Sequence, residues 1–296
     1  TAEELSAALG QIEAQVYIAP GNHDWYGPGS PYLTVKWPEN VHIFTQPRLE
    51  TMEWPEKNLV LHGAAFTHGE QADGFLTGFT APADGKLHIG LLHGEIDPSE
   101  ARYDPIRKEE IAASGLAYLA LGHIHKRTEP LTYGGTVCAW PGCLMGRGFD
   151  ECGQKGALLV ELDESGCRTE FLPVHTRRYE ILQLEAGENA LASATAALPE
   201  DTQDDCYRLI FAGESDPLDL AALERALAPR FFSLSLRDRT LPKTDLWAGC
   251  GEDTLRGHFL LELKQRYDGA DEATRRVLAQ AVKLTLALMD GREVLL

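Results

Sequence analysis

Positive charge is scarce in this sequence. Its 296 residues hold 27 Lys and Arg against 45 Asp and Glu, which gives a formal net charge of −18 and a pI near 4.9. Proteins that bind nucleic acid on their own normally carry a basic face, so the composition argues against that class. It does not exclude an enzyme in which bound metals and a local basic groove supply the positive field.

Paired cysteines and long apolar runs are also missing. The chain has six scattered cysteines and no C-x-x-C pair: Cys138, Cys143, Cys152, Cys167, Cys206 and Cys250. Disulfide scaffolds are small and rich in cysteine, so we expect free thiols in a reducing compartment. No apolar stretch reaches the length of a membrane span, and the start lacks a signal-peptide pattern. We therefore expect a cytoplasmic protein without membrane contact.

A short apolar run at residues 16–19 ends in Pro-Gly and is followed by Asn22, His23 and Asp24. This pattern is typical of a buried strand that stops abruptly and presents polar side chains on the next loop. An Asn carbonyl ligates hard cations, a His protonates a leaving oxygen, and an Asp fixes the tautomer of a His. Turn formation is the alternative, because Asn and Asp favour turns through local hydrogen bonds.

Two later strand-like runs also end in histidine. The first ends at His93, and the second is followed by His123 and His125. On extended backbone an H-x-H pair places both imidazoles on one side, because side chains alternate with period two. Three runs of this kind favour a metal site. For the other histidines we expect ordinary core or surface positions: His42, His62, His68, His88, His175 and His258.

The order Asn-His-Asp, then a strand-borne His, then Gly-His-x-His resembles the calcineurin-like metallophosphoesterase superfamily. Longer strings resemble its bacterial DNA-repair exonuclease branch, which includes the SbcD-type and YhaO-type nuclease subunits. These strings lie at residues 20–24, 29–32, 37–44, 141–143 and 146–151. The likeness is strong from about residue 14 to residue 180 and weaker, but traceable, through the C-terminal part.

The resemblance implies an α/β fold with two parts. Residues 1–175 would form a two-sheet α/β sandwich, the metallophosphoesterase domain, and residues 176–296 a small α+β capping or partner domain. The pattern also predicts strands over 41–44 and 59–62 and a helix over 105–113. The superfamily's first two motifs, Asp-x-His and Gly-Asp-x-x-Asp, do not occur in this sequence. We therefore expect the N-terminal part of the first domain to be missing from it.

The resemblance assigns metal-binding roles to four residues. Asn22, His93 and His123 would hold one divalent ion and His125 a second one. Mixed oxygen and nitrogen ligands suit Mn²⁺ best, and Mg²⁺, Fe²⁺ and Zn²⁺ stay open. The remaining ligands of the second ion would lie in the missing motifs.

The resemblance also implies catalytic roles for two residues of the first loop. His23 would protonate the leaving oxygen or stabilise the transition state, and Asp24 would orient it. Three further residues are weaker candidates for substrate contact. Tyr26 would stack on a base or sugar or anchor the loop, and Arg127 and Arg147 would hold phosphate or form structural salt bridges.

Three hypotheses about function follow. The leading one is a Mn²⁺-dependent DNA exonuclease or endonuclease subunit in DNA repair, which works with an SMC-like coiled-coil ATPase and forms a homodimer. The acidic composition makes a partner that contributes DNA affinity more important. The second is a phosphodiesterase or phosphatase that acts on small phosphate esters. The third is a non-catalytic scaffold with an incomplete metal site.

Overall fold

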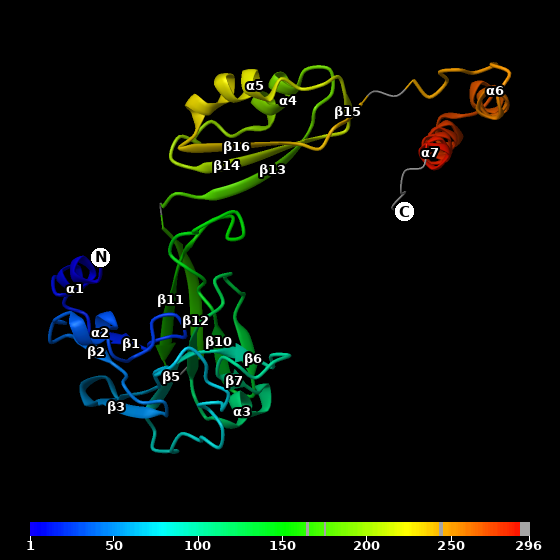
Figure 1. The fold of residues 1–296 in the computed structure, drawn as a ribbon. Helices are drawn as coiled ribbons and strands as arrows, with labels where there is room; N and C mark the ends of the chain where they lie inside the picture. The colour runs from blue at the N-terminus through cyan, green and yellow to red at the C-terminus, as the bar shows by residue number, and fades with distance from the viewer. Residues whose placement is uncertain (164–165, 175, 243–244, 291–296) are drawn as a thin grey trace. The chain divides into compact units, whose positions relative to one another are not determined.

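The computed structural model describes residues 1–296 except 164–165, 175, 243–244 and 291–296. The chain divides into two compact units (Figure 1). The first comprises Thr1–Ile181, Asp201–Arg208 and Arg230–Ser233, and the second Leu182–Glu200, Leu209–Pro229 and Leu234–Leu296. The last residue of the first predicted domain, residue 175, lies outside the described residues.

A six-stranded sheet forms the centre of the first unit (Figure 1). Its order is β3 (Glu50–Trp54), β4 (Leu59–Gly63), β5 (Leu87–His93), β8 (Tyr118–Gly122), β10 (Thr136–Ala139) and β9 (Leu131–Tyr133). The four inner strands are parallel, whereas β3 and β9 are antiparallel edge strands. Because the inner strands are parallel, their carboxyl ends meet at one edge of the sheet.

The core of this unit lies against the central strands. Leu92 on β5, Leu119 and Leu121 on β8 and the nearby Ile106 and Ile111 are almost completely buried. Full burial of one such side chain stabilises the fold by about 1.5–3 kcal/mol. The residues of β5 alternate between more and less buried positions, as expected where side chains point to opposite faces of a sheet.

Smaller elements surround the central sheet in the first unit. They are α1 (Ala2–Leu9), β1 (Val16–Ile18), α2 (Pro31–Thr34), β2 (Val41–Ile43), η1 (Pro55–Lys57), β6 (Glu95–Ile96), β7 (Pro105–Ile106), α3 (Lys108–Ala113), β11 (Gly156–Asp163) and β12 (Gly166–Pro173). β1 and β2 pair in parallel, and β11 and β12 form a long antiparallel hairpin. The predicted helix over 105–113 is partly wrong, because Pro105 and Ile106 pair with β6 and only α3 is helical.

The remaining elements follow residue 178. They are β13 (Tyr179–Glu185), α4 (Ala190–Ala197), β14 (Cys206–Ala212), β15 (Glu214–Ser215), α5 (Leu220–Leu227), η2 (Ala228–Arg230), β16 (Ser233–Asp238), β17 (Leu241–Pro242), α6 (Leu255–Asp268) and α7 (Glu272–Met289). Strands β13, β14 and β16 form a three-stranded sheet. Helices α6 and α7 share a small core of Leu260, Val282 and Leu286.

The mixed α/β fold with a central multi-stranded sheet is confirmed. The capping role of the C-terminal part stays a prediction. In the part of the chain that the structure describes, none of the helices has the length and apolar content that a membrane crossing requires.

Candidate functional site

Two of the predicted metal ligands meet at the carboxyl edge of the central sheet. His93 is the last residue of β5, and its register partner on β8 is Gly122, which directly precedes His123. The parallel pairing therefore brings the two histidines together, with His93 Nε2 3.3 Å from His123 Nδ1 and ring centroids 5.1 Å apart.

Asn22 joins these histidines from the loop after β1. Its Oδ1 lies 2.8 Å from His93 Nε2, and the residue is only 7% exposed. Backbone hydrogen bonds hold the loop to the segment after β4: Phe66 N donates to Pro20 O, and Tyr26 N donates to Phe66 O. The structure thus collects Asn22, His93 and His123 from three segments that are far apart in sequence.

Two glycines make room for the His93 ring. A Cβ atom at Gly21 would lie 2.5 Å from His93 Nδ1, and one at Gly122 would lie 2.9 Å from the same atom. Real Cβ atoms do not approach a ring nitrogen this closely, so a larger residue at either position would displace the imidazole. Both glycines are therefore required by the close approach of the ring.

His123 has a backbone conformation that is unusual for its residue type. Its φ is +92°, in the left-handed region that L side chains rarely adopt. Such a conformation costs on the order of 1–3 kcal/mol and is typical of functional sites. Since β8 ends at Gly122, the prediction that His123 and His125 lie on extended strand backbone is wrong.

Burial keeps His93 neutral. Removal from water is the largest cause that lowers its pKa, to about 4, and His123 is the second. His23 and His125 act in the same direction and Asp24 in the opposite one, so these groups share one electrostatic environment. A neutral imidazole is the form that binds metal ions.

A carboxylate and an aromatic ring fix the other side of His123. Glu95 Oε1 on β6 lies 2.7 Å from His123 Nε2. The Tyr103 ring lies 5.0 Å from the His123 ring at an angle of 38°. Neither residue was predicted, and the only sequence signal for Glu95 is an acidic residue two positions after His93.

His125 lies apart from the hydrogen bonds that join Asn22, His93 and His123. Its side chain is 52% exposed, and its Nδ1 hydrogen-bonds Glu151 Oε1. Glu151 Oε2 also accepts the backbone N–H of Arg147 at 2.8 Å. These two hydrogen bonds, that of His125 first, hold the pKa of Glu151 below its usual value. Glu151 is a second carboxylate that sequence analysis missed.

The predicted acid–base pair has a different arrangement from the expected one. Asp24 accepts hydrogen bonds from the backbone N–H of Gly21 at 3.0 Å and from the Tyr32 hydroxyl. Burial, followed by the hydrogen bond to Asp24, raises the pKa of Tyr32. His23 is exposed to solvent. In the described chain no hydrogen bond joins Asp24 to His23, so the orienting role of Asp24 stays a prediction.

The three candidate substrate contacts lie in the same unit. Tyr26 is half-buried on the loop after Asn22. The Arg127 guanidinium lies 4.7 Å from the centroid of the Phe171 ring, and its Nη2 is 2.9 Å from Glu129 Oε1. Arg147 is exposed and is anchored through its backbone to Glu151. Their substrate contacts stay predictions.

The donor atoms around His93 fit one divalent cation. The Nε2–H of His93 donates to Asn22 Oδ1 and lies next to His123 Nδ1. A cation would replace this proton and meet one oxygen and two nitrogen donors. Within the described residues no group of three or more His, Cys, Asp or Glu is arranged for a metal, and this set contains two histidines and an amide.

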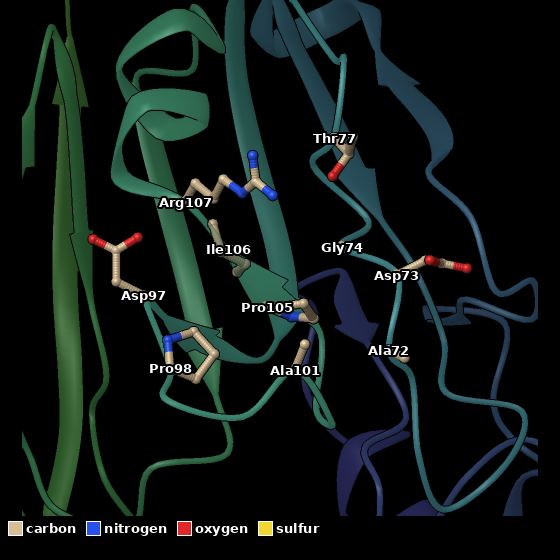
Figure 2. Close-up of a pocket in the computed structure, with 10 residues that line it drawn as sticks. All are labelled: Ala72, Asp73, Gly74, Thr77, Asp97, Pro98, Ala101, Pro105, Ile106 and Arg107. Atoms are coloured by element: carbon tan, nitrogen blue, oxygen red, sulfur yellow. The ribbon is translucent and has the colours of Figure 1, made fainter.

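A cavity of about 690 Å³ lies beside the loop that carries Tyr103. Figure 2 shows the segment 72–77 on one side and the segment 97–107 on the other. It is lined by Ala72, Asp73, Gly74, Thr77, Asp97, Pro98, Ala101, Pro105, Ile106 and Arg107. No predicted site residue lines this cavity, so the predicted chemistry lies outside it.

One curated protein is similar to this chain in sequence. No family model matches the chain. The chain is 29% identical over 218 residues to the "Uncharacterized metallophosphoesterase YhaO" of Bacillus subtilis (strain 168). This similarity supports the metallophosphoesterase superfamily.

The match covers 69% of this chain and 53% of the relative, so the chain spans about half the length of the curated protein it matches. Metal-dependent phosphoester hydrolysis is the general chemistry that the similarity supports. The relative's name specifies no nucleic-acid substrate and no particular metal.

Proposed function

We propose that this chain is part of a metal-dependent phosphodiesterase, and more narrowly of a DNA exonuclease or endonuclease subunit in DNA repair. The observation that carries the proposal is the convergence of Asn22 Oδ1, His93 Nε2 and His123 Nδ1 at the edge of the sheet. The chain spans about half the length of the relative, so we propose the activity for a protein that contains this chain and not for the chain alone.

In this proposal, the site residues have different roles in catalysis. Asn22, His93 and His123 hold one divalent ion, and His125 contributes to a second. When bound, such ions polarise a phosphoryl oxygen and lower the pKa of a water molecule. His23, exposed next to Asn22, donates a proton to the leaving oxygen. Its exposure allows it to reach a substrate without displacing the less exposed ligands.

Mn²⁺ is the ion we propose first. An amide oxygen together with two imidazole nitrogens forms a ligand set of intermediate hardness, which suits Mn²⁺. Mg²⁺, Fe²⁺ and Zn²⁺ are the alternatives. The six cysteines, of which none is in a disulfide in the described structure, support a reducing compartment, and we propose the cytoplasm.

The charge of the chain supports a proposal about partners. With a net charge of −18, the chain as a whole repels a polyanion. We propose that an SMC-like coiled-coil ATPase subunit supplies part of the DNA affinity and that the complex contains a homodimer of the nuclease subunit.

Cleavage of linear DNA with Mn²⁺ tests this proposal on the longer gene product, with and without its ATPase partner. His93→Ala and His123→Ala should abolish cleavage, because each removes a ligand. His258→Ala is the matched control, because the His258 side chain is exposed on α6 and contacts Asp253, far along the chain from the predicted ligands. Failure of the intact protein to cut DNA with Mn²⁺ under any partner condition would refute the nuclease proposal.

A phosphodiesterase that acts on small phosphate esters is the second candidate. The negative charge of the chain favours it, because a small ester carries fewer repelled phosphates than DNA. Turnover of a chromogenic phosphodiester without DNA cleavage, lost in both His→Ala variants, would select this candidate.

A further inference from the structure

The two histidines that follow β8 contact carboxylates through different ring nitrogens. His123 uses Nε2, which lies 2.7 Å from Glu95 Oε1. His125 uses Nδ1, which hydrogen-bonds Glu151 Oε1. Neither glutamate belongs to the predicted ligand set.

These contacts determine where the ring hydrogens lie. An ionised carboxylate only accepts hydrogen bonds, so the ring nitrogen that faces it carries the hydrogen. In a neutral imidazole the other nitrogen then has the lone pair. His123 therefore directs the lone pair of Nδ1 toward His93 and Asn22, whereas His125 has its lone pair on Nε2.

We propose that Glu95 and Glu151 are positioning residues that hold His123 and His125 in opposite tautomers, so that each ring presents a lone pair to a metal ion. This inference rests on the proposed metallophosphoesterase function. It goes further by naming the residues of this chain that prepare the two histidines before an ion binds.

Glu95 is well fixed for this role. It lies on β6, which pairs in parallel with β7, and its backbone N–H donates to Asp104 O at 3.3 Å. Tyr103, which directly precedes Asp104, packs against the His123 ring, with ring centroids 5.0 Å apart. The ring is therefore held by a hydrogen bond at one atom and by an aromatic contact on one face.

Glu151 is fixed by several donors. Its Oε2 accepts the backbone N–H of Arg147 at 2.8 Å, and the Cys143 thiol lies 4.0 Å from the same oxygen. Its side chain is only 14% exposed, whereas that of its partner His125 is 52% exposed. A mostly buried, prearranged carboxylate can thus orient a ring that solvent would otherwise leave free to rotate.

Nitrogen-15 NMR of the metal-free chain tests the tautomers directly. Long-range ¹H–¹⁵N spectra, recorded at a pH where the imidazoles are neutral, distinguish Nδ1–H from Nε2–H rings. His123→Gln and His125→Gln assign the signals. We expect Nε2–H for His123 and Nδ1–H for His125. The same tautomer for both rings would overturn the proposal.

Variants of the two glutamates then test whether the carboxylates cause these tautomers. In Glu95→Ala, His123 should populate both tautomers while His125 is unchanged. In Glu151→Ala, His125 should populate both tautomers while His123 is unchanged. Glu95→Gln should keep both tautomers, because its amide oxygen still accepts from the His123 ring. Glu151→Gln is not a conservative control, because Glu151 accepts N–H groups at both oxygens and a glutamine offers only one acceptor. Asp84→Ala is the matched control, since Asp84 Oδ1 lies 3.0 Å from His88 Nε2 near the opposite end of β5. Unchanged tautomers in both alanine variants would also overturn the proposal.

Mn²⁺ binding, measured by electron paramagnetic resonance, gives a second readout. Loss of either carboxylate should weaken Mn²⁺ binding about 10–100-fold, and Glu95→Gln should lose less than Glu95→Ala. Equal affinity in all variants would contradict a positioning role. The tautomers are measured without metal or DNA, so failure of the nuclease proposal and failure of this inference are distinguishable.

Discussion

Asn22 Oδ1 lies 2.8 Å from His93 Nε2, although 71 residues separate the two along the chain. The contact joins the loop after β1 to the end of β5. It depends on Gly21, where a Cβ atom would lie 2.5 Å from His93 Nδ1. The absence of a side chain at Gly21 is therefore part of the geometry that brings the two donors together.

Gly21→Ala should separate Asn22 from His93. The added methyl group overlaps the His93 ring, and overpacking of this kind costs about 1–3 kcal/mol of stability. We expect Mn²⁺ affinity to fall at least about tenfold, since a second ligand moves with the loop. Isothermal titration calorimetry measures this loss. Gly135→Ala is the control, because nothing lies within 4 Å of its Cβ position, and equal losses in both variants would contradict the prediction.

The sequence singled out Asn22, His93 and His123, which the structure brings together, but it did not predict the orientation of their side chains. The apolar runs before His93 and Gly122 predicted strands, and the structure pairs these strands in parallel, with His93 opposite Gly122. The period-two argument failed at His123, because the strand ends one residue earlier and φ becomes positive. Local alternation cannot predict a backbone conformation that the surrounding structure imposes.

Glu95 and Glu151 show a second kind of contact that could not be predicted from the sequence. Glu95 lies 28 residues from its partner His123, and Glu151 lies 26 residues from its partner His125. No periodicity links residues at such distances, and acidic residues are abundant in this chain. Contacts of this kind follow from strand order and loop path, and these become known only once the chain is folded.

His62 should make the protein less stable in acid. His62 Nε2 lies 2.9 Å from His88 Nδ1 inside the sheet, and burial, then His88, lowers the pKa of His62 to about 4. The folded pKa is below the unfolded value of about 6.5, so the folded state binds fewer protons. Stability is full above pH 6.5 and falls toward pH 4, by on the order of 3 kcal/mol.

Urea unfolding between pH 4 and pH 8 checks this dependence. His62→Gln keeps hydrogen-bonding capacity toward His88 and removes the titrating group, so its stability should fall less in acid than that of the wild type. The other groups around His62 are Asp84, which opposes the shift, and Thr51 and Phe79, which carry no charge. Parallel pH profiles for variant and wild type would contradict the prediction.

Asp104 should make the protein less stable as the pH rises, which is opposite to the effect of His62. Its Oδ1 accepts the backbone N–H of Phe75 at 2.6 Å, while Oδ2 is buried and has no hydrogen-bond partner among the described residues. Burial raises the pKa of this carboxyl to about 7 from the model-peptide value of 3.8. Its contribution to stability is therefore full below pH 3.8 and is lost as the pH rises to about 7.

Asp104→Asn isolates this contribution. The amide can accept from Phe75 N and does not ionise, so the variant should lack the decrease in stability between about pH 4 and pH 7. The effects of His62 and Asp104 overlap in this range with opposite sign, so the wild-type profile alone does not separate them. The double variant with His62→Gln should be flatter than either single variant, and a decrease that persists in Asp104→Asn would exclude this carboxyl as its cause.

Mn²⁺ should stabilise the first unit through Asn22, His93 and His123. A ligand that binds only the folded state adds RT ln(1 + [L]/Kd), which is about 2.7 kcal/mol at 100 times Kd. We expect the midpoint of thermal unfolding to rise with Mn²⁺ concentration in the wild type and in His258→Ala. The increase should vanish in His93→Ala, because this variant lacks the buried neutral imidazole at the centre of the donor set. An equal increase in His93→Ala would show that Mn²⁺ binds elsewhere on this acidic chain, and chelation by EDTA should reverse the stabilisation only where the site is intact.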